Sequence, residues 1–277
     1  MIIDGHAHAA GVFFSVDTLV PVLDELGVDK VVLCQNIRHD PREVRVPFEK
    51  GQIANRSSIA YAGSRFLRLG AWIMAADKGL KSRNAVVREL AAKRPDRIIP
   101  FYWANPQDKS VLKDLDKALG EDGFRGVKLH QSVTRFSCDE PILNDLAAIA
   151  AREKSPVFIH LYSRTEVRKL IAWALRNPRT QFIVAHMIGL EILAPRAAEL
   201  KNVALDISPA WGSTAERIKF AAEAFGAGRL VLGSDTPFGQ ETLKKNIDKV
   251  RNLNLTPGEK ALILGLNMAR FLNIAGQ

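Results

Sequence analysis

Short apolar runs alternate along the chain with segments whose apolar residues recur every three or four positions. A run of four to eight apolar or β-branched residues predicts a buried strand, whereas the longer spacing predicts an amphipathic helix. The first unit contains both patterns: residues 1–8 form a strand, Val16–Leu26 has helical spacing, and Lys30–Gln35 is a second apolar run. Strand, helix and strand in this order begin a parallel sheet.

The same alternation continues towards the C-terminal end. Six further strands are predicted, at Arg97–Trp103, Phe124–His130, Pro156–His160, Gln181–His186, Val203–Ile207 and Arg229–Asp235. Helices are predicted after them, at Lys109–Leu119, Pro141–Arg152, Thr165–Arg176, Leu190–Leu200, Ala215–Phe225 and Thr242–Leu253. Eight buried strands interleaved with helices are typical of an α/β fold, the (β/α)8 TIM barrel. A doubly wound open sheet would need a glycine-rich phosphate turn after an early strand, and the sequence has none.

One connection is longer than the others. Most strands start about 20 to 30 residues apart, as βα units do, but the second starts at Lys30 and the third at Arg97. The surplus, about residues 38–74, predicts an insertion after the second strand. Near the C-terminus, the segment TPGE at Thr256 combines a helix cap with an early proline and predicts a final helix. Because no linker or repeat is visible, one domain over residues 1–277 is expected.

Composition excludes several classes of protein. With 47% apolar and 25% charged residues, the chain resembles a globular enzyme. No apolar run approaches the roughly 20 residues of a membrane span, and the first residues lack a signal-peptide pattern, so a cytoplasmic protein without a membrane partner is expected. Cys34 and Cys138 match no Cys-x-x-Cys pattern, and we expect both to be small buried thiols.

The formal net charge of +9 raises the question of an anionic partner. Between Arg38 and Arg68 there are seven basic residues against three acidic ones. No run of five or more lysines and arginines and no aromatic-glycine RNA-binding signature occurs, so a nucleic-acid partner is not expected. Arg38, Arg42 and Arg45 follow the second strand and favour a carboxylate-bearing substrate. A salt-bridged surface or a homo-oligomer interface is the alternative role of these arginines.

The chain has six histidines, and five of them end predicted strands. His6 and His8 end the first strand, and His130, His160 and His186 end the fourth, fifth and sixth. The i, i+2 spacing of the first pair puts both imidazoles on one face of a strand, where they can hold one metal ion. In an eight-stranded barrel all of these ends lie on the rim that carries the active site. The remaining histidine lies in the insertion, either solvated or in contact with substrate.

A carboxylate falls at the corresponding end of the eighth strand. Asp235 stands in the segment LGSDTP, and because the eighth strand closes beside the first, it can reach a metal ion held by His6 and His8. A carboxylate with neutral imidazoles and an open position suits Zn²⁺, with Mn²⁺ or Fe²⁺ as alternatives, in a catalytic site. Asp235 is alternatively the N-cap of a following helix.

The motifs IDGHAH, PVFIH, FIVAH and LVLGSDTPFG occur in this order and span the chain. Together they resemble the amidohydrolase superfamily, and most closely the branch that includes aminocarboxymuconate semialdehyde decarboxylase and related metal-dependent hydrolases. The resemblance implies a barrel with one divalent metal ion, usually zinc. Residue by residue, it implies that His6, His8, His160 and Asp235 are metal ligands and that His186 lies beside the metal-bound water.

Lys128 and His130 lie two apart on the fourth strand and should share a face. In binuclear members of the superfamily, a lysine that ends this strand is carbamylated and bridges two metal ions. Lys128 lies short of the strand end, and the branch with the strongest resemblance does not use such a bridge. A structural cation paired to a barrel carboxylate is the alternative. His130 is either a substrate contact or a residue satisfied on the rim.

The expected function is a metal-dependent hydrolase of a small amide, lactone or ester. A metal-activated water would attack the carbonyl while the catalytic pair, Asp235 and His186, transfers the proton and orients the water. The alternative is a metal-dependent, non-oxidative decarboxylase of a small unsaturated or aromatic acid, and the motifs do not separate the two. A non-catalytic polyanion-binding barrel is the third hypothesis. Substrate contacts are expected from His130, Lys128, Arg38, Trp103, Asn105, Trp211 and Phe238.

Overall fold

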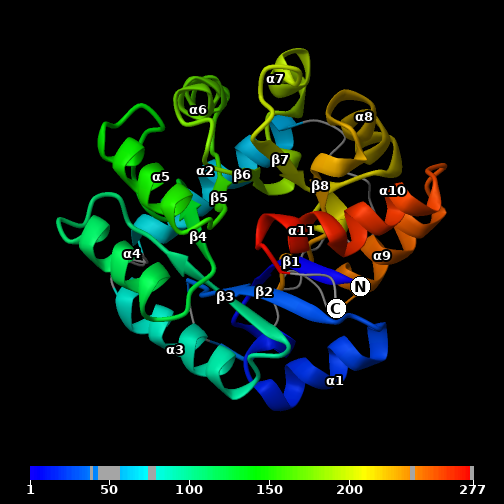
Figure 1. Cartoon of the computed structure of the whole chain (residues 1–277), viewed down its shortest axis with the longest axis horizontal. Coiled ribbons are helices and arrows are strands. Elements are labelled where there is room, and N and C mark those ends of the chain that lie inside the picture. Colours follow the sequence, from blue (N-terminus) through cyan, green and yellow to red (C-terminus); the bar gives the residue numbers. More distant parts are fainter. Residues whose placement is uncertain (38–39, 43–56, 74–78, 238–240, 275–277) are drawn as a thin grey trace.

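Eight parallel strands in sequence order form a barrel with helices around it (Figure 1). The structure is a computed structural model, which describes residues 1–37, 40–42, 57–73, 79–237 and 241–274. The strands are β1 (Ile3–His8), β2 (Lys30–Cys34), β3 (Ile98–Trp103), β4 (Gly126–His130), β5 (Val157–His160), β6 (Phe182–Val184), β7 (Val203–Asp206) and β8 (Leu230–Val231). The predicted (β/α)8 TIM barrel is confirmed.

The barrel closes between β8 and β1 through backbone hydrogen bonds that lie just beyond the short β8. Gly5 N donates to Leu232 O over 2.8 Å, and Asp235 N donates to His6 O over 2.7 Å. These bonds hold the segment after β8 directly against the histidine-bearing end of β1. The predicted proximity of Asp235 to the first strand therefore has a backbone origin.

Amphipathic helices cover the outside of the barrel. They are α1 (Val16–Leu26), α3 (Leu80–Lys93), α4 (Val111–Gly120), α5 (Ile142–Arg152), α6 (Arg164–Arg176), α7 (Leu190–Leu193), α8 (Ala215–Phe225) and α9 (Thr242–Asn252). In α1, for example, Leu19 and Leu23 are fully buried against the strands, and Gly27 ends the helix with a left-handed φ of 64°. Among the described helices, none combines the length and the apolar character that crossing a bilayer requires.

The C-terminal segment closes the end of the barrel at which the strands begin. It consists of α10 (Pro257–Ala261), a π-helical turn (Leu262–Leu266) and α11 (Asn267–Phe271), and the predicted capping box between Thr256 and Glu259 is present. Met268 and Phe271 pack into the same buried apolar cluster as inward-facing strand residues such as Phe101. This floor excludes water from the lower half of the barrel, so polar chemistry is confined to the other end.

Some predicted boundaries were wrong, and each has a local cause. The strand β6 ends before His186, and β8 ends at Val231, well before Asp235. Both residues adopt a left-handed backbone, with φ of 57° and 55°, so neither belongs to a strand. Helix α7 is shorter than predicted and gives way to a 3-10 turn at Ala194–Arg196. This turn contains Pro195, which has no N–H with which to continue an α-helix.

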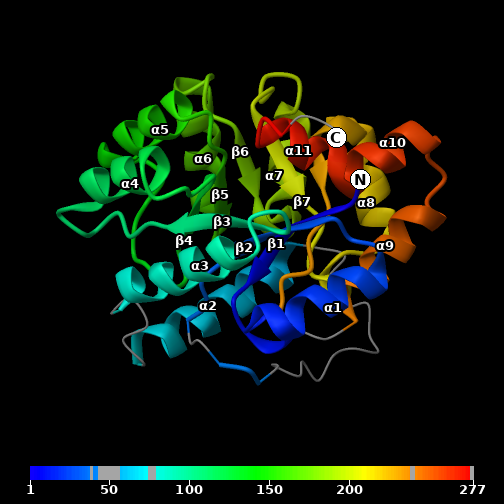
Figure 2. The ribbon, with the colours of Figure 1, turned by 60° about the horizontal axis from the view of Figure 1, so that its bottom comes forward.

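The insertion after β2 contains a helix for which the sequence analysis predicted no element. Helix α2 (Ser57–Ile73) lies at the end of the barrel opposite α11 (Figure 2). Arg68 attaches it to two strand ends: its Nη1 donates to Gln131 O over 3.1 Å, and its guanidinium lies 4.4 Å from the centre of the Tyr162 ring. Helix α2 therefore borders the rim where the histidine-bearing strands end.

Candidate metal centre

The polar side chains of the upper barrel come from the ends of β1, β4 and β5, where alternate residues face inward. His6 and His8 face inward from β1, Lys128 and His130 from β4, and His160 from β5, and all five are almost completely buried. The expectation that Lys128 and His130 share a face holds in the structure. Their enclosure matters because electrostatic interactions are stronger where water is excluded.

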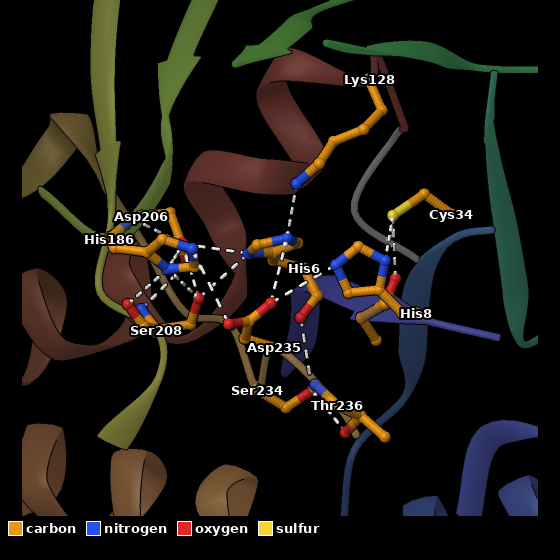
Figure 3. Close-up of polar contacts among 12 residues, drawn as sticks. His6, His8, Cys34, Lys128, His186, Asp206, Ser208, Ser234, Asp235 and Thr236 are labelled. Carbon is orange, nitrogen blue, oxygen red and sulfur yellow. Dashed lines mark hydrogen bonds and ion pairs between the residues drawn. The ribbon is translucent and has the colours of Figure 1, made fainter. Parts of the chain in front are cut away.

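Asp235 lies beside the two β1 histidines and His186 (Figure 3). Its Oδ1 is 3.5 Å from His6 Nε2 and 3.4 Å from His8 Nε2, and its Oδ2 is 3.7 Å from His186 Nε2. The structure thus brings together four of the residues that the sequence analysis singled out. No described helix starts directly after Asp235, since α9 begins at Thr242 with Glu241 as its N-cap. The alternative N-cap role for Asp235 was therefore wrong.

The left-handed backbone at Asp235 and His186 directs their side chains over the barrel. A non-glycine residue in this region costs about 1 kcal/mol or more, so surrounding contacts must hold it in place. Asp235 N donates to His6 O over 2.7 Å, and His186 N donates to Asp206 Oδ2 over 3.1 Å. These hydrogen bonds from the two backbone N–H groups therefore compensate the cost of the left-handed conformation.

The Nδ1 atoms of His6 and His8 both lie within hydrogen-bond distance of acceptors. His6 Nδ1 lies 3.1 Å from Asp206 Oδ2 and 3.0 Å from Ser208 Oγ, and His8 Nδ1 lies 2.7 Å from Gln35 O. Because an ionised carboxylate and a carbonyl can only accept, each Nδ1 carries the hydrogen. Nε2 of both rings therefore faces Asp235, and it is through this atom that each neutral imidazole would bind a metal ion.

Asp206 is a functional residue that the sequence analysis missed. It is fully buried at the end of β7, and its carboxylate accepts from Ser208 Oγ over 2.6 Å as well as from His6 Nδ1 and His186 N. His186 Nδ1 in turn donates to Ser208 O over 2.9 Å, which leaves its Nε2 facing Asp235. The available signal was a carboxylate at the end of the otherwise apolar run VALD, on the same rim as the histidines.

Burial sets the protonation of most of these histidines. It lowers the pKa of His6 and of His130 well below the usual range, and the neighbouring Lys128 lowers both further. Burial, followed by the adjacent His130, does the same for the pKa of His160. These three rings are consequently neutral near pH 7.

For His8 and Asp235, neighbouring groups outweigh the effect of burial on the pKa. Burial would lower the pKa of His8, but Cys34 and Asp235 raise it to about 10. Burial would raise the pKa of Asp235, but His186 and His6 outweigh it, so the pKa of this carboxyl is lowered. The centre therefore holds an ionised carboxylate among imidazole nitrogens.

This donor set fits a divalent metal ion. Two imidazole Nε2 atoms and a carboxylate converge from His6, His8 and Asp235, and outer acceptors already orient both rings. Ligand atoms of His6, His8 and Cys34, and of His6, His186 and Asp206, also lie within 4.8 Å of one another. Both cysteines are buried free thiols, as expected.

Lys128 departs from the expected structural role. Its Nζ is 2.7 Å from His6 Nε2 and 4.4 Å from the centre of the Phe158 ring. Among the described residues, no carboxylate lies within 4.0 Å of Nζ, so the expected ion pair with a barrel carboxylate is not formed. Burial lowers the pKa of Lys128. The lysine therefore places a buried amine beside the proposed metal ligands, and among the described residues no carboxylate is in direct contact with it.

A wall of stacked rings continues from this centre. Trp103 stacks on His130 at 5.4 Å with an angle of 9° between the planes, and His130 stacks on His160 at 4.0 Å and 7°. The His160 ring lies 5.0 Å from that of His186. Trp103 Nε1 and His160 Nδ1 are buried without a hydrogen-bond partner in the described part of the chain. The wall thus combines flat apolar faces with polar atoms that a ligand could satisfy.

The remaining predicted substrate contacts lie elsewhere or are not described. Asn105 Oδ1 accepts from Gln107 N over 3.1 Å, and Asn105 lines a separate concavity of about 220 Å³ between α3 and α4. Trp211 is half-buried in the 3-10 turn Ala210–Gly212. Arg38 and Phe238 lie outside the described residues, as do His39 and Arg45. Arg42 is exposed and paired with Asp40, which matches the alternative of a salt-bridged surface.

Comparison with known proteins identifies the family of this chain. Residues 3–274 match the family model described as amidohydrolase. The chain belongs to this family. The superfamily resemblance that the motifs indicated is therefore confirmed for this amidohydrolase. No protein with a curated description matches it in sequence.

Several solved structures share the fold of this amidohydrolase. The 2,6-dihydroxybenzoate decarboxylase from Rhizobium is 16% identical, with a TM-score of 0.72 over 99% of both chains. The 5-carboxyvanillate decarboxylase from Sphingomonas paucimobilis is 14% identical, with a TM-score of 0.63 over 93% of this chain and 82% of that one. A dihydroxybenzoic acid decarboxylase from Polaromonas, with bound manganese and 2-nitroresorcinol, is 15% identical, with a TM-score of 0.67 over 100% and 98%. At these identities the likeness is one of fold.

A partly buried polar cluster anchors the insertion helix to the His186 loop. Ser57, at the start of α2, donates through Oγ to Glu191 Oε2 over 2.6 Å, and Arg217 Nη1 donates to Glu191 Oε1 over 2.7 Å. Arg217 Nη2 also donates to Met187 O, next to His186, over 2.9 Å. Burial would raise the pKa of Glu191, but Arg217 and Ser57 lower it to about 2.

Replacing Glu191 by glutamine is expected to give a pH-dependent loss of stability. Because the folded pKa is depressed, the ionised carboxylate stabilises the fold above about pH 4.5, and this contribution is lost as the pH falls towards about 2. The side chain is 44% exposed, so we expect about 1 kcal/mol at pH 7. Urea unfolding of both proteins between pH 7 and pH 3 measures the difference. A difference that does not shrink below pH 4.5 would contradict the assignment.

A second substitution tests the close packing behind the metal centre. A Cβ at Gly233 would lie 2.4 Å from Asp206 Oδ1 and 2.9 Å from His6 Cβ. Neither atom can give way easily because Asp206 is held by four donors. Gly233→Ala is therefore expected to destabilise the protein by about 1–3 kcal/mol. Gly63→Ala on α2 is the matched control, since nothing lies within 4 Å of its Cβ position, and equal unfolding midpoints would refute the packing argument.

Proposed function

We propose that this amidohydrolase is a metal-dependent, non-oxidative decarboxylase of a small aromatic acid. The observation that carries this proposal is the buried amine of Lys128, which has no carboxylate partner among the described residues and lies 2.7 Å from His6 Nε2. A buried cation is stable only when an anion compensates it. A substrate carboxylate would supply that compensation beside the metal ligands, where the bond to be broken must lie.

The ring wall supports an aromatic substrate. Trp103, His130 and His160 stack with nearly parallel planes, and a planar ring can extend such a stack at little entropic cost. The similar structures named as 2,6-dihydroxybenzoate and 5-carboxyvanillate decarboxylases support the same substrate class. The sequence analysis had this reaction as its alternative and hydrolysis as its main expectation.

His6, His8, His160 and Asp235 would hold the divalent ion. When bound, such an ion supplies a Lewis acid that polarises substrate oxygens and lowers the pKa of water. Mn²⁺ is the ion named with two of the similar decarboxylases, and Zn²⁺ suits the same donors. With the ion on His6 Nε2, Lys128 would no longer donate a hydrogen bond to that atom. Its amine would turn to the substrate carboxylate instead.

His186 and Asp235 would move the proton. Their facing atoms, Nε2 and Oδ2, lie 3.7 Å apart, and His186 Nδ1 keeps its hydrogen on Ser208 O, so the pair can hold one transferable proton at Nε2. In the reaction, that proton would form a C–H bond at the ring carbon bearing the carboxylate. The C–C bond to the carboxylate then breaks, its electron pair restores the ring, and carbon dioxide leaves.

Hydrolysis of an amide, lactone or ester would use the same residues in the opposite order. Asp235 and His186 would first accept a proton from water and then return it to the leaving group. That reaction needs no cation for a substrate carboxylate, so Lys128 separates the two functions. Removing the lysine should weaken decarboxylation and leave hydrolysis of a neutral ester unchanged.

Carbon dioxide release tests the proposal directly. Protein loaded with Mn²⁺ or Zn²⁺ is incubated with dihydroxybenzoates and carboxyvanillate, and in parallel with neutral lactones and esters. We expect turnover of at least one hydroxylated benzoate and a KM raised about tenfold or more in Lys128→Met, with unchanged metal content. Lys113→Met, on the exposed face of α4, is the control. Hydrolysis of neutral substrates without release of carbon dioxide would overturn the proposal.

A further inference from the structure

A basic concavity lies at the end of the barrel opposite the histidines. It has a volume of about 500 Å³ and is bordered by the turns that precede β5, β6, β7 and β8 and by α11. Each turn and the helix contribute one cation: Lys154, Arg179, Lys201, Arg229 and Arg270. No aspartate or glutamate is among its described lining residues. Figure 2 shows α11 at the end away from α2, so this concavity is separate from the candidate metal centre.

These cations lack the partners that other basic residues on this surface have. Exposed pairs elsewhere include Lys81 with Asp114 at 2.6 Å and Arg88 with Asp122 at 3.0 Å. In the described part of the chain, none of the five basic residues of the concavity forms an ion pair within 4.0 Å. Like charges that line one concavity repel, and a bound anion would relieve this repulsion.

Two of the cations are held rigidly by the backbone. Arg229 Nη1 donates to Ala197 O and Leu200 O over 2.8 Å each, and Arg270 Nη2 donates to Asn267 Oδ1 over 3.4 Å as well as to Gly228 O. Their remaining charge is directed without further loss of side-chain entropy. These two cations are thus preorganised.

The other three cations are exposed and free to adapt. Lys154, Arg179 and Lys201 make no side-chain hydrogen bond among the described residues, and their exposure leaves room for a ligand to approach. The polar neighbours are already occupied, since Gln181 Nε2 donates to Phe182 O and Asn202 O. Recognition at this concavity would therefore rest on the cations.

We propose that this concavity binds a small molecule bearing two or more linked phosphate groups. The volume is in the range of small-ligand sites, and adjacent phosphates match several cations that converge on one concavity. A single carboxylate would engage only one or two of the five cations. The site is distinct from the proposed decarboxylase site, and neither proposal depends on the other.

Titration calorimetry with inorganic pyrophosphate and with ADP, at low and at physiological salt, tests the proposal. We expect saturable binding of one equivalent that weakens as salt rises. The double variant Arg179→Glu/Lys201→Glu should lose at least about tenfold in affinity. Lys93→Glu/Lys113→Glu, which makes the same change in net charge on α3 and α4, should bind as the unmodified protein does.

A short DNA duplex is titrated as a third probe. Three results would overturn the proposal: no saturable binding of pyrophosphate or ADP, equal losses in both double variants, or binding of the duplex alone. Equal losses would mean that net charge attracts the anion without a site. Metal content of the Arg179→Glu/Lys201→Glu variant should match that of the unmodified protein, since the two sites lie at opposite ends of the barrel. Thermal unfolding of both variants shows that the substitutions leave the fold intact.

Discussion

Asp235→Asn is expected to lose both bound metal and activity, with a fall in kcat of about a thousandfold or more. The carboxylate lies within 3.7 Å of the Nε2 atoms of His6, His8 and His186. An amide in its place binds metal ions weakly and cannot accept a proton from His186. Metal analysis after dialysis and single-turnover assays of the loaded protein measure the two losses separately.

Comparing Asp235→Asn with His186→Asn distinguishes a metal ligand from a residue that only transfers a proton. His186 Nε2 faces Asp235, but its ring is oriented by Ser208 and Asp206 rather than by the other two imidazoles. We therefore expect His186→Asn to keep its metal and lose activity. Asp139→Asn, whose carboxylate is 56% exposed, should match the unmodified protein. An Asp235→Asn protein that retains a full equivalent of metal after dialysis would show that this carboxylate is no ligand.

Asp206→Asn is expected to weaken metal binding by about 10- to 100-fold, although Asp206 would not touch the metal. One carboxylate oxygen accepts from His6 Nδ1, Ser208 Oγ and His186 N, and the other accepts from Ser208 N over 3.0 Å. In either orientation of an asparagine side chain, its NH₂ group would face one of these two sets of donors, with which it cannot form a hydrogen bond. The His6 ring then loses either its acceptor or the negative charge of that acceptor, which keeps its Nε2 unprotonated and aimed at the centre.

The control for this prediction is Ser208→Ala, which removes one hydroxyl and leaves the carboxylate. Its metal affinity should fall less than that of Asp206→Asn, because His6 Nδ1 retains its charged partner. The dissociation constant from a competing chelator is the decisive measurement, and near-ultraviolet circular dichroism reports whether the core is intact. Equal affinities of Asp206→Asn and the unmodified protein would exclude a positioning role for Asp206.

The arrangement of Asp206 has a wider consequence for the centre. The same carboxylate orients His6, a proposed ligand, and His186, a proposed proton carrier. Their relative position is thus set by one side chain on β7. A displacement of this strand would move both functions together. A side chain at Gly233 would cause such a displacement, because its Cβ would collide with Asp206 Oδ1 and His6 Cβ.

Regular apolar periodicity made most of the barrel predictable. Helix α8 occupies Ala215–Phe225 as predicted, because burial of one helix face gives its periodicity. Strand β5 ends at His160 as predicted, because burial of the whole strand gives a continuous apolar run. The pattern was less informative where a single residue leaves the regular backbone. His186 and Asp235 were predicted to end strands. Their φ of 57° and 55° instead depends on hydrogen-bonding partners that residues far away in the sequence supply.

The amino-acid sequence by itself determined the eight strands, the rim on which the histidines gather and the family of the chain. It did so because strand and helix periods are local, and because the C-terminal ends of parallel strands in a barrel must meet. Only the tertiary structure decided which partners those residues have. The bond from Lys128 to His6 and the shared carboxylate of Asp206 join residues 122 and 200 positions apart. Such contacts depend on the three-dimensional register of β1, β4 and β7, which no local pattern encodes.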